Sequence, residues 1–358
     1  MIRSYQVSLV ELPLPRPMAT AIHRTEAVYC ALLQVQTDDA EGQSFVFSLN
    51  RHRALALKPM IDSLAAIYVQ ADENAVESLW QQALADLNPV GTQGFAISAL
   101  TAWDTAVWDA IGCARQMPLC QMFGQVRDQV PAYASSGLWL DQSIDELINE
   151  AADFVAQGFR QIKLRVDGDI QASADRAMAL RQALGDSIGI LADANQSLDV
   201  DTAIQLARAL ERADIVWLEE PVIHHDLAGQ RQVKDSSPIP IASGETDYTA
   251  RGLEPTLAAG ATDVLMPDLQ RMGGLSEMRV VSDLAARYHT PISTHIFTEY
   301  SLSIAGSAPN CISVEHVDWF AGLFTQPVVI DQGQAQIPSG PGTGFRFDLD
   351  RIRDGLIG

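Results

Sequence analysis

Apolar positions follow two different patterns along the chain, and the change falls near residue 125. Before that point, alternating apolar and polar residues predict strands over 4–14, 27–37 and 44–50. Stretches with apolar residues every three or four positions predict helices over 53–69, 73–87 and 94–115. Strands followed by helices favour a separate α+β domain, which we assign to residues 1–125.

From Val130 onward, short apolar runs alternate regularly with amphipathic stretches. The amphipathic stretches predict helices that include 144–158, 173–185 and 200–212. The apolar runs predict eight strands, at 130–137, 160–166, 188–195, 215–221, 240–245, 263–268, 291–297 and 311–316. This alternation indicates a parallel sheet, and eight strands favour a closed barrel over a doubly wound open sheet, which stays an alternative.

The expected domain organisation therefore has three parts. The α+β domain covers residues 1–125, the barrel covers 126–325, and a Gly- and Pro-rich tail covers 326–358. We expect the tail to pack back on the first domain.

Composition and charge narrow the classes of function. The chain has 358 residues, 47% of them hydrophobic and 19% charged, which is typical of a globular protein. The net charge of −21 argues against nucleic acid as a partner, and it means that an anionic substrate needs local cations or a metal. No apolar run reaches the roughly 20 residues of a membrane span, and the N-terminus lacks a signal pattern, so we expect a cytoplasmic protein. The four cysteines show no zinc-binding spacing and are expected to be reduced thiols.

Charged or imidazole side chains end most of the predicted barrel strands, at intervals of 20 to 30 residues. The carboxyl ends of all strands of a parallel barrel meet on one face, where active sites form. The spacing therefore predicts a single site built from distant positions. The series is Lys163, Arg165, Asp193, Glu219, Glu245, Asp268, His295 and Glu315.

Three successive strands end in carboxylates, namely Asp193, Glu219 and Glu245. Acidic residues are common at loop starts, so one such residue would carry little weight. Three at equal steps would repel one another on one barrel mouth unless a cation lay between them. Hard oxygen ligands suit Mg²⁺, and we predict a magnesium site formed by these three residues.

The next two strands end in Asp268 and His295. An aspartate that accepts from one imidazole nitrogen fixes the tautomer and raises the basicity of the other nitrogen. A histidine alone is more often structural, but adjacent strands would bring these two together. We therefore predict a His–Asp general base.

Lys163 and Arg165 lie two residues apart on one strand, so their side chains point the same way. Facing inward, they would bind a substrate carboxylate; facing outward, they would be surface cations, and the pattern favours neither. Glu315 is either a hydrogen-bond partner of the substrate or a rim carboxylate. Asn195, two residues after Asp193, is a candidate for supporting the site or for binding substrate.

Seven short motifs around these residues together resemble the enolase superfamily, and within it the mandelate racemase subgroup. They are KLR, DANQSLD, WLEEPVIHHD, SGE, MPDLQRMGG, STHIF and VEH. The resemblance extends over nearly the whole chain. The resemblance implies an α+β capping domain over a modified (β/α)₇β barrel of the TIM type. Superfamily sites use a Lys or His base with Mg²⁺, which stabilises the enediolate formed by removing the proton α to a carboxylate. The resemblance also implies a homo-oligomer, often an octamer.

The resemblance assigns roles to individual residues. It implies that Asp193, Glu219 and Glu245 bind the metal, that His295 with Asp268 is the base, and that Glu315 is a carboxylic acid that hydrogen-bonds the enediolate. Lys163 matches a lysine that contacts the substrate carboxylate, and Ser135 lies near another position with that role. A loop with His23 and Arg24 matches the family's mobile lid, and its polar side chains suit a polyhydroxylated or dicarboxylic acid.

Arg165 departs from the family pattern, because mandelate racemase-like enzymes usually carry a second lysine there as the base for the opposite face. Arginine is a poor base at neutral pH, and this argues against racemisation. We therefore predict a Mg²⁺-dependent acid-sugar dehydratase, a carbon–oxygen lyase acting on a small-molecule carboxylate. A racemase or epimerase of a 2-hydroxy acid is the first alternative, and a non-catalytic metal-binding scaffold is the second.

Overall fold

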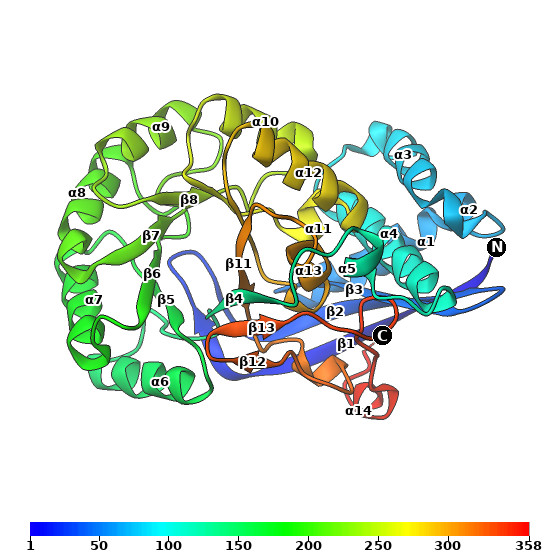
Figure 1. Cartoon of the computed structure of the whole chain (residues 1–358), viewed down its shortest axis with the longest axis horizontal. Coiled ribbons are helices and arrows are strands. Elements are labelled where there is room, and N and C mark those ends of the chain that lie inside the picture. The colour runs from blue at the N-terminus through cyan, green and yellow to red at the C-terminus, as the bar shows by residue number, and fades with distance from the viewer. Residues whose placement is uncertain (358) are drawn as a thin grey trace.

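The computed structural model describes residues 1–357, and its N-terminal part is an antiparallel sheet covered by helices (Figure 1). The sheet order is β1–β2–β3, with β1 (Ile2–Ala19), β2 (Arg24–Thr37) and β3 (Glu41–Ser48). The helices that follow are α1 (Arg51–Ser63), α2 (Ala65–Tyr68), α3 (Val76–Asp86), α4 (Phe95–Ala114) and α5 (Leu119–Met122). The single helix predicted over 53–69 is two helices, because the chain forms a tighter turn at Leu64, whose N–H bonds to the Ile61 carbonyl.

The second part is a barrel of eight parallel strands that closes where β11 pairs with β4 (Figure 1). The strands are β4 (Gln129–Ala134), β5 (Gln161–Arg165), β6 (Gly189–Asp193), β7 (Ile215–Glu219), β8 (Ile241–Ser243), β9 (Val264–Leu265), β10 (Ile292–Thr294) and β11 (Cys311–His316). The predicted α/β barrel with an α+β cap is confirmed, and the open doubly wound sheet is excluded by the closing pair.

Helices connect the successive barrel strands and pack outside them. They are α6 (Ile144–Ala156), α7 (Ile170–Leu184), α8 (Val200–Leu210), α9 (Leu227–Ser236), α10 (Thr249–Ala258), α11 (Leu269–Met272), α12 (Leu275–Arg287) and α13 (Thr298–Ala305). Polar N-caps start several of them. Ser143 and Glu146 form a reciprocal capping box on α6, and the aspartates Asp169, Asp199 and Asp226 cap α7, α8 and α9. These caps define where the helices after the strands begin.

The segment after the barrel adds β12 (Ile330–Asp331), β13 (Gln334–Gln336) and α14 (Leu349–Arg353). β13 pairs antiparallel with β4, an addition that the sequence pattern did not predict. Farther on, the tail contacts the N-terminal part through Asp109 of α4. Its buried carboxylate accepts hydrogen bonds from the N–H and hydroxyl of Thr343 and pairs with Arg346 at 2.9 Å. These contacts join the two ends of the chain around one buried charge.

No helix among the described residues is both long enough and apolar enough to cross a membrane.

Glu299 on α13 is a buried carboxyl group at the junction of the barrel and the N-terminal sheet, within electrostatic reach of Cys30 on β2. Its Oε2 has no hydrogen-bond partner among residues 1–357. Burial raises the pKa of Glu299 from 4.5 to about 7. The folded state thus holds this proton more tightly than the unfolded chain, and stability is lost as pH rises from about 4.5 to about 7.

Replacing Glu299 by Gln removes this titration while keeping the size of the side chain. Near pH 8 the wild-type carboxylate is buried and ionised. There we expect Glu299→Gln to increase the free energy of unfolding by on the order of a few kcal/mol, and so to raise the melting temperature. Near pH 5 the wild type and the variant should have the same melting temperature. Calorimetric melts at both pH values, with the exposed Glu254→Gln as control, would measure this. An equal shift at both pH values would contradict the assignment.

Candidate active site

The polar residues that end the barrel strands gather at one mouth of the barrel. Arg165 lies opposite Asp193 in the β5–β6 register, and Asp193 lies opposite Glu219 in the β6–β7 register. Glu315 lies within β11. Glu245, Asp268 and His295 follow β8, β9 and β10 in the adjoining loops, because those three strands are shorter than the sequence predicts.

Lys163 is the central cation of this mouth, and its side chain is only 1% exposed. Its Nζ lies 2.7 Å from Glu219 Oε1, 2.6 Å from Glu315 Oε1 and 3.3 Å from Asp193 Oδ2. Burial by itself would lower the pKa of Lys163, but the attraction of Glu219 and Glu315 outweighs burial and raises it. The ammonium is therefore charged and bridges three carboxylates.

Arg165 extends this charge network towards β4. Its Nη1 pairs with Asp193, and its Nη2 donates to the hydroxyl of Ser135 at 2.9 Å and to the Ser135 carbonyl at 3.2 Å. Its guanidinium also lies 5.0 Å from the ring centroid of Trp139. Lys163 and Arg165 thus both face inward, and the alternative of an outward-facing surface pair does not hold.

His295 lies on the side of the mouth formed by β8 to β10. Its Nδ1 is 2.6 Å from Asp268 Oδ2, and its Nε2 is 3.2 Å from Glu245 Oε2 and 3.8 Å from Glu315 Oε2. Burial would lower the pKa of His295, but Glu245, Glu315 and Asp268 outweigh it and raise the pKa to about 9. The Asp268 contact fixes one ring nitrogen, so Nε2 is the nitrogen directed at the centre of the site.

Glu315 is held as an ion in this arrangement. Although burial would raise its pKa, Lys163, His295 and Arg165 lower it to about 2. Its Oε1 also accepts from the Ser135 hydroxyl, and its Oε2 accepts from the N–H of Ile296 at 3.2 Å. Glu315 therefore acts here as an acceptor, whereas the resemblance implies that it donates a proton; that role stays a prediction.

Asp193, Glu219 and Glu245 are the residues that could hold a metal. All three are buried, at 1%, 0% and 8% exposure. Burial raises the pKa of Glu219 well above its usual value, because the opposing attraction of Lys163 does not outweigh burial and the repulsion of Asp193 and Glu315. Within residues 1–357, no group of three or more Asp, Glu, His or Cys side chains is arranged around a common metal position, and the Lys163 ammonium contacts both Asp193 and Glu219. The donor atoms, the burial and the mutual repulsion nevertheless fit a hard divalent cation.

The remaining predicted residues lie at the edge of this network. The side chain of Asn195 donates to Asp193 Oδ2 at 3.2 Å, and its N–H donates to Oδ1 at 2.8 Å, so it orients that carboxylate. Arg24 pairs with Asp141 at 3.0 Å on the exposed rim. His23 lies in the turn between β1 and β2, and its pKa is lowered by partial burial and by Arg271.

Two groups of residues near the mouth were missed by the sequence analysis. Arg271, on α11, donates to the carbonyl oxygen of Glu245 and lies 4.0 Å from its carboxylate. His224 pairs with Asp247 at 2.9 Å, and Gln196 joins His224 to Glu220. The only available signal was proximity in sequence, since each of these residues lies within five positions of Asp193, Glu219, Glu245 or Asp268. Their partners could not be assigned without the fold.

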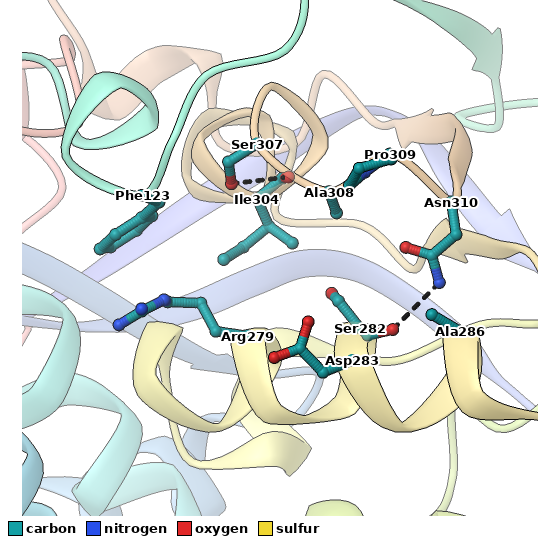
Figure 2. A pocket seen from close by; sticks show the side chains of 10 residues that line it. All are labelled: Phe123, Arg279, Ser282, Asp283, Ala286, Ile304, Ser307, Ala308, Pro309 and Asn310. Carbon is teal, nitrogen blue, oxygen red and sulfur yellow. Dashed lines mark hydrogen bonds between the residues drawn. The ribbon is translucent and has the colours of Figure 1, made fainter.

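A separate hollow of about 340 Å³ lies on the outer wall of the barrel (Figure 2). Arg279 of α12 stacks on Phe123 at 4.8 Å there, and Asn310 donates to the Ser282 carbonyl at 3.0 Å. Asn310 directly precedes β11, so the hollow adjoins the amino end of that strand. It is therefore not part of the site at the carboxyl ends.

Removing the bridging cation tests the charge network. Lys163→Met, measured with a chelator present, should destabilise the protein by about 3–5 kcal/mol because Glu219 and Glu315 lose their buried partner. Lys58→Met, which removes an exposed pair with Asp62, should cost less than about 1 kcal/mol. Calorimetric or urea unfolding would compare the two variants. Equal, small losses would show that Lys163 does not compensate the buried carboxylates.

Sequence models of two domains match the chain. The "Enolase C-terminal domain-like" model matches residues 146–351, and the "Mandelate racemase / muconate lactonizing enzyme, N-terminal domain" model matches residues 4–124. The 3,6-anhydro-alpha-L-galactonate cycloisomerase of Streptomyces coelicolor is 32% identical over 98% of both chains. The L-talarate/galactarate dehydratase of Salmonella typhimurium is 30% identical over 95% of this chain and 87% of its own.

Solved structures have the same architecture. A racemase from Streptomyces coelicolor A3(2) with bound magnesium matches with a TM-score of 0.95 and 30% identity, over 100% of both chains. The structure of the Salmonella typhimurium dehydratase matches with a TM-score of 0.95 and 28% identity, over 100% of this chain and 92% of its own. Together with the two domain matches, this establishes that the chain belongs to the enolase superfamily, in the mandelate racemase/muconate lactonizing enzyme subgroup.

Proposed function

We propose that the protein is a Mg²⁺-dependent acid-sugar dehydratase that removes water from a polyhydroxylated mono- or dicarboxylic acid. The observation that carries the proposal is the one-sided placement of the base. His295 with Asp268 lies on one side of the carboxylate cluster, and Arg165 lies near Lys163 and Asp193 on the other. Relatives that dehydrate sugar acids support it, among them an arabinonate dehydratase 28% identical over 90% of this chain.

Binding of the substrate would depend on the cations of β5. Lys163 and Arg165 hold carboxylates of the site and would hold the carboxylate of the substrate in the same way. Asp193, Glu219 and Glu245 would hold Mg²⁺, which when bound supplies positive charge against the enediolate oxygens. His23 and Arg24 belong to the hairpin turn that would cover the bound acid.

Proton transfer would use Nε2 of His295, the ring nitrogen that does not contact Asp268. With a cation at Glu245 to offset the negative charge that raises the pKa of His295, Nε2 would be unprotonated and would take the proton from the α-carbon, while Asp268 holds the ring and stabilises the imidazolium. The imidazolium then returns its proton to the β-hydroxyl, so the α-C–H and β-C–O bonds break, a C=C bond forms and water leaves. The resulting enol tautomerises to a 2-keto-3-deoxy acid.

The racemase or epimerase alternative requires a proton acceptor on each face of the α-carbon. The pKa of Arg165 is raised further above its already high value, because burial is outweighed by Asp193 and Glu315. A guanidinium in this setting does not accept a proton at neutral pH. Arg165 therefore favours elimination over inversion.

A second candidate is the opening of an anhydro-sugar acid, favoured by the 32% identity to the Streptomyces coelicolor cycloisomerase. In a 3,6-anhydro acid the β-carbon carries the ring ether oxygen in place of a hydroxyl group. His295 would protonate that oxygen as the β-C–O bond breaks, and the ring would open without losing water. The product would be an isomer of the substrate. We further propose a homo-oligomer, from the family resemblance alone, and a cytoplasmic location, from the sequence pattern alone.

Proton NMR in D₂O, with Mg²⁺ and a panel of sugar mono- and diacids including anhydro acids, tests these proposals together. We expect loss of one substrate and growth of the signals of a 3-deoxy-2-keto acid. Mass spectrometry separates loss of water from isomerisation. Deuterium at the α-position with inversion and no keto product would instead support the racemase alternative.

His295→Asn tests the assigned base. This variant should lose turnover by a factor of about 10³ or more, since it removes the proton acceptor, while Mg²⁺ still raises its melting temperature. His289→Asn, an exposed histidine on the outer surface, is the control and should keep full activity. Turnover that survives in His295→Asn would remove His295 from the mechanism.

A further inference from the structure

The N-terminal sheet ends in β3, and the free edge of this strand meets the barrel through a glutamine side chain. The N–H of Phe47 donates to Gln270 Oε1 at 2.8 Å, and Gln270 Nε2 donates to the Phe47 carbonyl at 3.1 Å. The amide of Gln270 therefore satisfies both backbone groups of Phe47, as a neighbouring strand would. Its Nε2 also lies 3.1 Å from the hydroxyl of Ser98 on α4.

Gln270 belongs to α11, the four-residue helix that starts at the predicted base partner. Asp268 is the N-cap of this helix, and its Oδ1 accepts the N–H of Arg271 at 2.9 Å. The other oxygen, Oδ2, contacts His295 Nδ1 at 2.6 Å. One carboxylate thus joins the helical turn to the imidazole, so a displacement of the turn would rotate Asp268 and shift His295.

The same turn carries a second connection to the site. Arg271 donates to the carbonyl oxygen of Glu245, one of the three proposed metal ligands. A single turn of helix therefore contacts the proposed base on one side and supports the backbone of a ligand on the other.

Further contacts from the N-terminal helices hold the segment on both sides of Gln270. The hydroxyl of Thr101 donates to the Gln270 carbonyl at 2.9 Å, and Trp80 Nε1 donates to the Gly273 carbonyl at 2.8 Å. Asp104 accepts the N–H of Ser276 at 2.9 Å, at the start of α12. Of these contacts, only that of Gln270 is made by a side chain of α11 and reaches the N-terminal sheet, which also carries the hairpin with His23.

We infer that Gln270 is a positioning residue, which fixes the Asp268–His295 pair by fastening α11 to β3 of the N-terminal domain. The inference rests on the proposed function, because it assigns His295 as the base. It predicts that loss of the amide impairs proton abstraction more than substrate binding, since Lys163 and Arg165 lie on β5, away from α11. A purely structural role would lower stability without this selectivity.

The chain contains a matched control for this test. Gln43, on the same strand β3, accepts the N–H of Phe347 at 3.0 Å and donates to the Phe345 carbonyl at 3.3 Å. It makes the same kind of amide-to-backbone contact, but it fastens the C-terminal tail instead of α11. Comparing Gln270→Ala with Gln43→Ala therefore separates the general effect of losing a glutamine-to-backbone contact at β3 from the specific effect of releasing α11.

Gln270→Ala should lower kcat by about 10- to 100-fold with KM changed by less than about threefold. Gln43→Ala should lower the melting temperature by a similar or larger amount and leave kcat within about twofold. If both variants lose stability equally and both keep their kcat, Gln270 is only structural and the inference is wrong. A parallel rise of KM and loss of kcat in Gln270→Ala would also contradict it.

A second readout does not depend on turnover. Hydrogen exchange of the backbone amides of Arg271 and Met272, followed by mass spectrometry of the peptide, should be faster in Gln270→Ala and unchanged in Gln43→Ala. NMR of ¹⁵N-labelled histidine, at a pH high enough for the His295 ring to be neutral, should show a single Nδ1–H tautomer in the wild type and a mixture in Gln270→Ala. If the wild type turns over no acid, the proposed function is wrong. If hydrogen exchange of α11 and the tautomer of His295 are both unchanged in Gln270→Ala, the inference that Gln270 holds α11 in place is wrong.

Discussion

The site depends on the ion pairs that the Lys163 ammonium forms with buried carboxylates. Six buried carboxylates lie at the barrel mouth, at 0–8% exposure, and they cannot all ionise without cations among them. Lys163 contacts three of them, and Arg165 contacts one. The six are Asp193, Glu219, Glu220, Glu245, Asp268 and Glu315. This surplus of negative charge favours the binding of a divalent cation. It also raises the pKa of His295, through Glu245, Glu315 and Asp268.

The barrel explains how so dense a cluster can form. Seven of the eight strands, β5 to β11, contribute one or two charged or imidazole groups at or just after their carboxyl ends, and the parallel register places Arg165, Asp193 and Glu219 side by side. The shorter strands β8 to β10 place their polar residues in loops, where additional support is required. That support comes from the N-terminal domain, which holds α11 through Gln270 and Thr101. The N-terminal domain therefore also contacts the segment that begins with Asp268.

Much of this arrangement could be predicted from the sequence, because strands buried on both faces read as short apolar runs and their polar ends stand out. The positions of Lys163, Asp193, Glu219 and His295 follow from that pattern. The partners of side chains could not be predicted in the same way. Arg271 and Gln270 bond to backbone atoms of distant residues, which leaves no pattern in the sequence. The pairing of β13 with β4 was missed for the same reason, as both are short and far apart in the chain.

The most direct test of this account is calorimetric unfolding of the wild type and Asp193→Asn over a range of Mg²⁺ concentrations. A site whose carboxylates lack positive charge should gain about 2.7 kcal/mol of stability at a hundredfold excess over the Kd. We predict that the wild-type melting temperature rises with Mg²⁺ and that Asp193→Asn loses most of this rise. A wild-type melting temperature that does not respond to millimolar Mg²⁺ would contradict the account.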